Sequence, residues 1–164
     1  MMDPSEAKKI DSGWLVILFI WGAILGSLGI YLAVCLVLGD TLTGSMPDGF
    51  PLTTLRYALF GISVFTLVAV HFLRGFLLEN PGLMRSARPV PSSQHPAVAR
   101  YTVVVIITSA LLESIGIYGL ILFLLARDSL SLYQLIGLSA LAMLYYRPKK
   151  VDLLDLAERM KKME

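Results

Sequence analysis

The chain has 164 residues, of which 56% are hydrophobic and 16% are charged, and its formal net charge is +2. Soluble domains are nearer about 45–50% apolar and 25% charged, so this composition indicates an integral membrane protein rather than a soluble enzyme or a nucleic-acid binder. Disorder is excluded because it requires low hydrophobicity and high net charge. A disulfide scaffold is excluded because Cys35 is the only cysteine.

Four apolar stretches are long enough to be transmembrane helices, each of which needs about 20 mostly apolar residues. They cover residues 14–38, 57–78, 101–126 and 130–146. The first stretch is too long for the apolar core of a cleaved signal peptide, so we expect it to be retained. The sequence therefore predicts an all-α integral membrane protein with four transmembrane helices.

The basic residues give the expected orientation. With both termini inside, twelve of the fourteen Lys and Arg residues lie on the cytoplasmic side, and only Arg56 and Arg127 lie outside. Cytoplasmic loops carry an excess of basic residues, so we expect both ends to be cytoplasmic.

The connections divide the chain into five parts. Residues 1–13 form a cytoplasmic N-terminus, and a first transmembrane hairpin occupies residues 14–78. A Pro- and Ser-rich cytoplasmic loop follows at 79–99, then a second hairpin at 100–146 and a cytoplasmic segment at 147–164. Only residues 127–129 separate spans three and four, so these two must be antiparallel neighbours.

The last segment has the pattern of a short amphipathic helix. Its apolar residues recur at three-residue spacing, and two opposite-charge pairs stand at i, i+4: Val151, Leu154, Ala157 and Met160, with Asp155–Arg159 and Glu158–Lys162. The pattern favours a helix on the membrane surface or on the protein's own loops over one that binds a partner.

An internal repeat links the two predicted hairpins. Residues 22–31, GAILGSLGIY, match residues 109–118, SALLESIGIY, at six of ten positions. Residues 57–63 and 133–139 share the pattern Tyr-x-Leu-x-Gly-x-Ser. Two helices separate each pair, so both members cross the bilayer in the same direction, and the pattern indicates a parallel duplication of one hairpin into two.

Small residues line one face of both repeat segments. Gly22, Gly26 and Gly29 project along one side of the first span, as their counterparts Ser109, Glu113 and Gly116 do on the third. Small residues at this spacing allow another helix to approach closely, so we expect helix packing at Gly22, Gly26, Gly29, Ser109 and Gly116.

Glu113 is the residue that helix packing does not explain, because it replaces Gly26 of the repeat near the middle of the third span. A charge at the bilayer centre costs at least about 2.5–3.5 kcal/mol on insertion scales, and such residues are usually functional. A carboxyl group there can take up a proton or small cation on one side and release it on the other. His71 lies near the cytoplasmic end of span two, and we expect it to be a satisfied or interfacial histidine rather than a relay partner.

The stretch from Ala110 to Leu125, ALLESIGIYGLILFLL, resembles the ion-carrying outer helix of the c subunits, or proteolipids, of rotary F- and V-type ATP synthases. The resemblance implies that Glu113 binds the ion, that Ser114 can ligate it and that Tyr118 steadies the carboxylate. It implies proton or sodium translocation, with H⁺ or Na⁺ as the only bound cofactor. It also implies a bacterial or archaeal inner membrane, in a homo-oligomer or with other membrane subunits.

Two further interpretations remain. One is a non-catalytic accessory, assembly or scaffold subunit of the same descent. The other is a small multidrug transporter with four helices and one embedded Glu. The strong charge bias and the position of Glu113 in the third span argue against the transporter. The sequence has no phosphate-binding loop, no Ser-His-Asp set and no CxxC pair, so no self-contained active site is expected.

Overall fold

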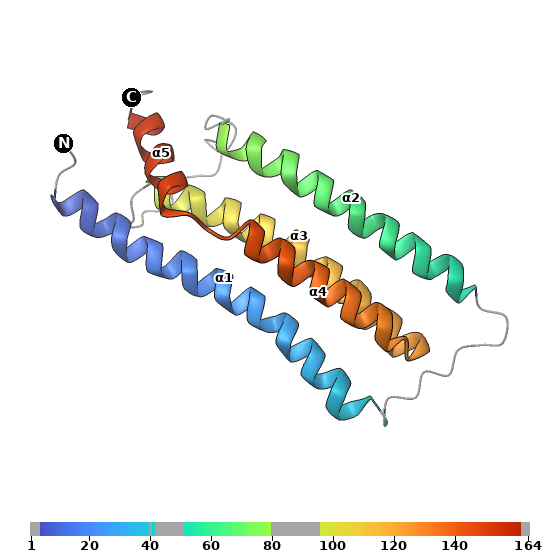
Figure 1. Ribbon diagram of the computed structural model, residues 1–164. Coiled ribbons are helices and arrows are strands. Elements are labelled where there is room, and N and C mark those ends of the chain that lie inside the picture. The colour runs from blue at the N-terminus through green and yellow to red at the C-terminus, as the bar shows by residue number, and fades with distance from the viewer. Residues whose placement is uncertain (1–3, 40, 42–50, 80–95, 162–164) are drawn as a thin grey trace.

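The computed structural model describes residues 4–39, 41, 51–79 and 96–161, and these residues form five α-helices (Figure 1). Their bounds are α1 Pro4–Leu38, α2 Leu52–Glu79, α3 Pro96–Ala126, α4 Ser129–Tyr145 and α5 Lys150–Lys161. The first four run side by side as a bundle, and the part of the chain that is described contains no strand. The prediction of an all-α protein is confirmed. The greater part of the loop predicted at 79–99 lies outside the described residues.

Three helices are long and apolar enough to cross a membrane: α2, α3 and most of α1. With 17 residues, α4 is about 25 Å long, which is less than the roughly 30 Å of a hydrocarbon core. Together with α5, to which it is joined at a bend of 52°, α4 can form a fourth span. The fold is therefore that of an integral membrane protein with three to four candidate spans.

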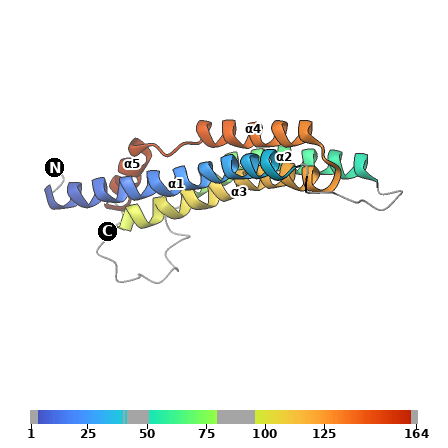
Figure 2. The same ribbon diagram turned by 90° about the horizontal axis from the view of Figure 1, so that it is seen from below.

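Helix α3 is the centre of the bundle. It packs most extensively against α4, and α1 and α2 also pack against it. Figure 1 shows α1 and α2 on opposite sides of the α3–α4 pair, and Figure 2 shows α4 on one side of the layer formed by α1, α3 and α2. The antiparallel neighbours predicted from the short third connection are thus present as α3 and α4.

The first predicted hairpin differs from expectation, because α1 and α2 do not pack together as a pair within the described residues. Residues 39–51 connect them. An extended segment of that length reaches roughly 40 Å, which is enough to cross the α3–α4 pair. Because α2 follows α1 in the chain, the two helices were expected to run in opposite directions. A connection this long, however, does not require the two helices to be neighbours in the bundle.

The turn between α3 and α4 is built by two residues. Arg127 adopts a left-handed conformation with φ of 54° and donates its N–H to the Phe123 carbonyl at 2.8 Å, which ends α3. Asp128 then caps α4, accepting hydrogen bonds from the backbone N–H of Ser131 at 3.1 Å and from its hydroxyl at 2.6 Å. Arg56 of α2 lies 3.5 Å from the same carboxylate. This turn therefore joins three helices at the end of the bundle away from the termini.

Pro148 explains the bend between α4 and α5, because the residue before a proline is disfavoured in helical conformation. Helix α5 then packs against the ends of α1 and α3 through Leu153, Leu156 and Ala157. The amphipathic helix is confirmed, and it covers helices of its own chain. The predicted apolar face was only partly right, because Val151 is 65% exposed. The buried side of α5 is formed instead by Leu153, Leu156 and Ala157, which follow the spacing i, i+3, i+4.

Polar contacts at the terminal end fix α5 in place. Lys150 forms an ion pair with Asp11 of α1 at 2.7 Å, and Arg74 of α2 forms one with Asp152 at 3.1 Å. These pairs connect different helices, unlike the predicted pair Asp155–Arg159 along α5 itself. The other predicted pair includes residue 162, which lies outside the described residues.

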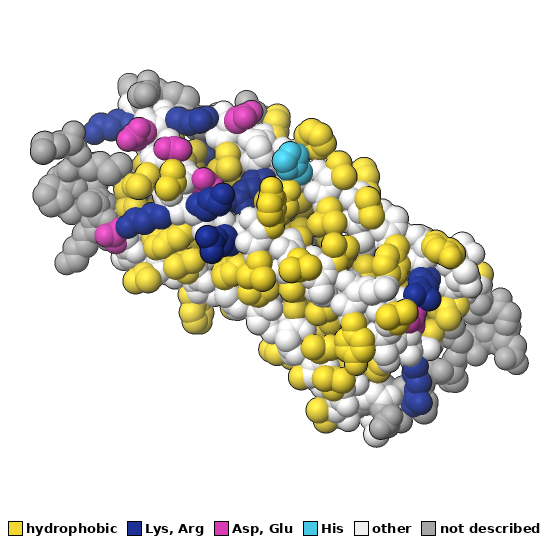
Figure 3. All heavy atoms as spheres, viewed as in Figure 1, with side chains coloured by type: hydrophobic (Ala, Val, Ile, Leu, Met, Phe, Trp, Pro, Cys, Tyr) yellow, Lys and Arg dark blue, Asp and Glu magenta, His cyan; other side chains and the backbone are white. Residues whose placement is uncertain are grey.

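The outer surface between the two ends is apolar. Figure 3 shows hydrophobic side chains over the length of the bundle, with charged side chains gathered at its two ends. Large side chains such as Phe19 (79% exposed), Phe65 (72%) and Leu141 (68%) point outward from three different helices. A soluble monomer rarely exposes so continuous an apolar surface, so the bilayer accounts for it.

Candidate functional site

The carboxylate of Glu113 lies between α3 and α1, half-buried near the middle of its helix. Its Oε1 accepts a hydrogen bond from the Ser27 hydroxyl at 2.5 Å and another from the Tyr31 hydroxyl at 2.7 Å. Both donors belong to α1. Ser27 and Tyr31 are four residues apart, so they occupy one face of α1 on successive turns. Two hydroxyls of one helix therefore hold the carboxylate of another.

Ser27 has a second acceptor within reach. Its Oγ lies 2.6 Å from the carbonyl oxygen of Ile24, one turn earlier in α1. A serine hydroxyl has one proton to donate and two lone pairs with which to accept. Ser27 can therefore donate to an ionised Glu113. It can equally donate to the Ile24 carbonyl while it accepts a hydrogen bond from a protonated Glu113. Ser27 and Glu113 can thus remain hydrogen-bonded in both protonation states of the carboxyl, with the direction of the hydrogen bond reversed.

The backbone beside Glu113 is fixed by α4. The hydroxyl of Ser139, which is fully buried, donates to the carbonyl of Leu112 at 2.7 Å. One turn further along, a side chain at Gly116 would meet a Leu28 methyl at 2.5 Å and Ser139 at 3.7 Å. Because α1 and α4 both close on α3 at this level, they hold Glu113 at a fixed height and orientation.

Neither of the two residues predicted beside Glu113 forms a hydrogen bond to its carboxylate. Ser114 donates its hydroxyl to the Leu111 carbonyl of its own helix at 2.7 Å. Tyr118 packs against the core cluster, and no described residue is hydrogen-bonded to its hydroxyl. Their positions, about 100° and 140° around α3 from Glu113, explain why neither reaches the carboxylate. A role for them in ion binding stays a prediction that these contacts do not support.

Sequence reasoning passed over Ser27 and Tyr31, although the repeat contained the signal. These two residues are the counterparts in α1 of Ser114 and Tyr118 in α3. The Ser and Tyr of the motif do surround the acid, but they come from the other copy. Parallel packing of α1 beside α3 brings the two copies together.

The small residues divide into two groups. Ser109 and Gly116 of α3 are buried inside the bundle, as expected for helix packing. Gly22, Gly26 and Gly29 of α1 face outward, and a methyl group added to any of them would find no atom within 4 Å. No described helix of this chain covers that face, so packing there stays a prediction about a second molecule.

The histidine predicted to be interfacial is placed away from Glu113. His71 is exposed, and its Nδ1 lies 3.2 Å from the hydroxyl of Tyr146, beside the start of α5. Arg74, one turn further, donates to the Tyr146 backbone carbonyl and pairs with Asp152. These contacts belong to the docking of α5 on the bundle. His95 lies outside the described residues.

No protein-family model, curated protein or solved structure matches this chain. Among the described residues no three His, Cys, Asp or Glu side chains gather as a metal site. The oxygen atoms that contact the Glu113 carboxylate come instead from the hydroxyls of Ser27 and Tyr31. Such hard oxygen ligands suit a proton or an alkali cation better than a transition metal.

Proposed function

We propose that this protein binds and releases a proton or a sodium ion at Glu113, within the membrane, as part of ion translocation. The observation that carries the proposal is the paired contact of Ser27, whose hydroxyl is within hydrogen-bond distance of both Glu113 and the Ile24 carbonyl. A carboxyl that exchanges an ion needs neighbours that satisfy it with and without its proton. Ser27 and Tyr31 provide such neighbours, and the resemblance of residues 110–125 to c subunits supports the same chemistry.

In this proposal each residue has a distinct role. Glu113 carries the ion, and Tyr31 holds Oε1 in one orientation. Ser27 either donates to the carboxylate or accepts from the carboxylic acid. For sodium, the carboxylate and the hydroxyls of Ser27 and Tyr31 are the oxygen ligands. The two termini lie on the cytoplasmic side, and the protein acts as a homo-oligomer or beside other membrane subunits.

A second candidate function is that of an accessory, assembly or scaffold subunit in a membrane complex. The same two hydrogen bonds favour it, because they also connect α1 to α3 and would stabilise a static bundle. A rotor-like ring requires many copies, whereas an accessory subunit requires one or two. The mass of the detergent-extracted native assembly distinguishes these two candidates.

Labelling with a hydrophobic carbodiimide tests the ion-exchange proposal, because this reagent modifies protonated carboxyl groups in apolar surroundings. We expect the wild-type protein to be modified near neutral pH and Glu113→Gln to remain unmodified in the mass spectrum. If sodium is the ion, added sodium should slow the reaction at constant pH; if a proton is the ion, only pH should change the rate.

Matched variants from the repeat serve as controls. Ser27→Ala and Tyr31→Phe should change the rate of labelling or its protection by sodium, whereas Ser114→Ala and Tyr118→Phe should not. An unlabelled wild-type protein, together with a Glu113→Gln variant of unchanged stability and assembly mass, would contradict ion exchange and leave the structural function.

A further inference from the structure

The oxygen atoms at Glu113 are separated by hydrogen-bond distances. Oε1 lies 2.5 Å from the Ser27 hydroxyl oxygen and 2.7 Å from that of Tyr31, and the Ser27 oxygen lies 2.6 Å from the Ile24 carbonyl oxygen. Hydrogen bonds from a hydroxyl to a charged oxygen are about 2.5–2.7 Å long. A proton therefore fits between Glu113 and Ser27 without any movement of the oxygen atoms.

A sodium ion requires a wider spacing of its ligands. Calcium, whose ionic radius is nearly the same as that of sodium, is bound by oxygen ligands at about 2.3–2.6 Å. Two ligands at right angles around an ion of this size are then roughly 3.3–3.7 Å apart. The two hydroxyl oxygens are closer to Glu113 Oε1 than this by about 0.6 Å or more. Joint binding of sodium therefore requires the hydroxyls of α1 to move away from the carboxylate of α3.

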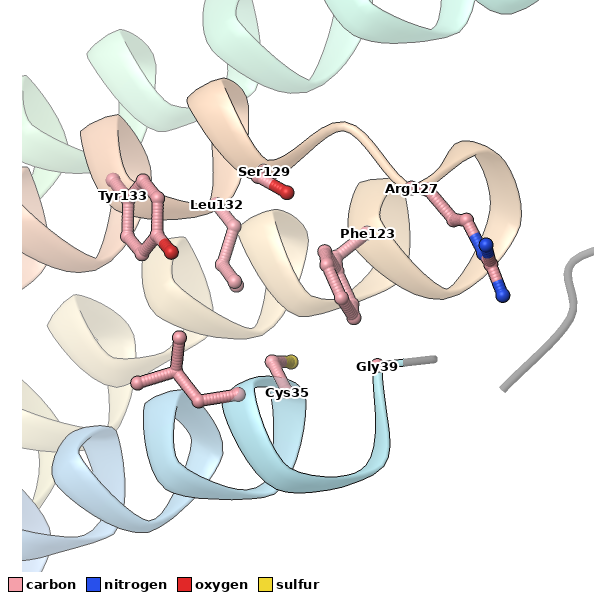
Figure 4. A pocket seen from close by; sticks show the side chains of 8 residues that line it. Cys35, Gly39, Phe123, Arg127, Ser129, Leu132 and Tyr133 are labelled. Carbon is pink, nitrogen blue, oxygen red and sulfur yellow. The ribbon is translucent and has the colours of Figure 1, made fainter. Parts of the chain in front are cut away.

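Glycines bring α1 close to α3 over a long stretch of the bundle. Near the start of α1, a methyl group added to Gly13 would overlap the side chain of Val98 in α3. Just beyond the end of α1, a methyl group added to Gly39 would lie 2.9 Å from the ring of Phe123, whose side chain points toward Gly39 in Figure 4. The distance between the two helices is thus fixed at both ends by direct contact.

Gly116 makes the contact nearest to the carboxylate. It lies about one turn beyond Glu113 in α3, and Leu28 is the neighbour of Ser27 in α1. A methyl group added to Gly116 would meet a Leu28 methyl at 2.5 Å, which is closer than carbon atoms of packed side chains approach one another. Leu28 is only 2% exposed and belongs to the core cluster, so it has little room to move aside. Gly116 therefore determines how near Ser27 comes to Glu113.

The charge of Glu113 has no basic partner within the bundle. Residues 14–38 of α1 and the whole of α4 contain no charged side chain, and residues 101–126 of α3 contain only Glu113. The basic residues of α2 lie nearer its ends, at the turn between α3 and α4 and beside α5. None of the ion pairs formed by the described residues includes Glu113. Either a proton or a bound cation must therefore neutralise this carboxylate, and the spacing of the oxygen atoms selects between them.

We propose that Glu113 exchanges a proton and not sodium, and that Gly116 sets this specificity through its close contact with Leu28. The proposal rests on ion exchange at Glu113, the proposed function, and names the ion. In the protonated site the carboxyl donates to the Ser27 oxygen, and Ser27 donates to the Ile24 carbonyl. On release the O–H bond of the carboxyl breaks, the proton passes to water, and Ser27 donates to the carboxylate. Gly116 is a positioning residue, because it acts only through the spacing of α1 and α3.

Infrared spectroscopy of the full-length protein in nanodiscs tests the proposal, because a protonated carboxyl has a C=O band that the carboxylate lacks. The band of Glu113 is the one that Glu113→Gln removes. Its intensity is followed against pH at increasing concentrations of sodium chloride, with choline chloride keeping the ionic strength constant. We expect the pH of half-protonation to be the same at every sodium concentration. Sodium that competed with the proton would lower this pH by up to about one unit for each tenfold rise in its concentration.

Gly116→Ala and Gly29→Ala are a matched pair, because the two glycines are counterparts in the repeat and Gly29 has open space around it. Gly116→Ala should weaken the hydrogen bond between Glu113 and Ser27 and move the C=O band to higher frequency, as Ser27→Ala does. Because the oxygen atoms are then farther apart, sodium should lower the pH of half-protonation in this variant. Gly29→Ala should keep the band and the sodium response of the wild-type protein.

A second substitution shows whether Gly116 acts through Leu28. Leu28→Ala removes the methyl group in contact, so the double variant Gly116→Ala/Leu28→Ala should regain the wild-type band and its independence of sodium. If Gly116→Ala alone does not fold, recovery of folding and of the wild-type response in the double variant supports the proposal. Failure of that recovery would contradict it.

The outcomes separate this proposal from the proposed function. A pH of half-protonation that depends on sodium in the wild-type protein would overturn proton specificity and leave ion exchange at Glu113 intact. The same sodium-independent response in a folded Gly116→Ala variant would overturn the role of Gly116. A Glu113 band that does not titrate at any pH at which the protein stays folded would overturn ion exchange itself, and this proposal with it.

Discussion

Removal of one hydroxyl, in Tyr31→Phe, tests the contact on which the site depends. The Tyr31 hydroxyl donates to Glu113 Oε1 at 2.7 Å, and both side chains are half-buried between α1 and α3. Phenylalanine keeps the ring and its packing, so the variant loses the hydrogen bond without leaving a cavity of any size. Tyr118→Phe removes the equivalent hydroxyl from the other copy of the repeat, where no described residue is bonded to it.

The expected magnitude follows from the charge of the acceptor. A hydrogen bond to a charged group contributes about 1.5–3 kcal/mol, and one between neutral groups about 0.5–1.5 kcal/mol. Tyr31→Phe should therefore lower the free energy of unfolding by about 0.5–1.5 kcal/mol where Glu113 is protonated and by about 1.5–3 kcal/mol where it is ionised. Tyr118→Phe should change it by less than about 0.5 kcal/mol, as substitutions outside specific contacts do.

Reversible unfolding in mixed micelles of increasing dodecyl sulfate content, followed by far-ultraviolet circular dichroism, measures both variants. A double-mutant cycle isolates the contact, since Tyr31→Phe should cost almost nothing in a Glu113→Ala background. Equal costs for Tyr31→Phe and Tyr118→Phe would refute the reasoning. So would a cost that persists in full when Glu113 has been removed.

Two further predictions concern the packing and the turn of the bundle. At Gly119 an added Cβ would meet the Leu132 backbone oxygen of α4 at 3.2 Å, so Gly119→Leu should lower stability in the same unfolding assay by about 1–3 kcal/mol or more. Gly26 has open space around it, so Gly26→Leu should leave the free energy of unfolding of the monomer unchanged. A loss of stability as large as that of Gly119→Leu would contradict the packing described. Burial raises the pKa of Asp128, but the hydrogen bonds from Ser131 and the charge of Arg56 outweigh it, so the pKa lies below its usual range. A lowered folded-state pKa stabilises the protein above the ordinary aspartate pKa of about 3.9, and this stability is lost as pH falls through the folded value. Asp128→Ala should therefore cost about 1 kcal/mol at neutral pH and progressively less in acid, and a cost independent of pH would show that the charge does not contribute.

Local features of the sequence predicted the elements of this fold well. Long, predominantly apolar runs indicated the long helices, and a connection of three residues between spans three and four required α3 and α4 to be neighbours. Those conclusions hold because a spanning helix must satisfy its own backbone, and a short loop leaves no alternative position for the next helix. The longer connection at residues 39–51 imposed no such restriction, and the separation of α1 from α2 could not be predicted from it.

The partners of Glu113 illustrate the same difference between local and tertiary information. Glu113 itself was identified from its depth in an apolar helix, which is a local property. Its donors depend on which helix packs beside α3 and on the rotation of that helix about its axis. Ser27 and Ser114 occupy equivalent positions in the two copies of the repeat, and only the packed structure shows that Ser27 contacts the carboxylate.

The repeat explains why the acid stands in only one of its two copies. Helix α3 is surrounded by α1, α2 and α4, whereas α1 has an outer face that no described helix covers. Equivalent positions therefore have different surroundings: Glu113 meets hydroxyls of α1, but Gly26 faces outward with nothing near it. A carboxylate at position 26 would be directed toward lipid without a donor, at the full cost of a charge in the bilayer. Both copies of the repeat carry the Ser and the Tyr. Because α3 is the central helix, position 113 is the one at which the hydroxyls of the other copy hold an acid.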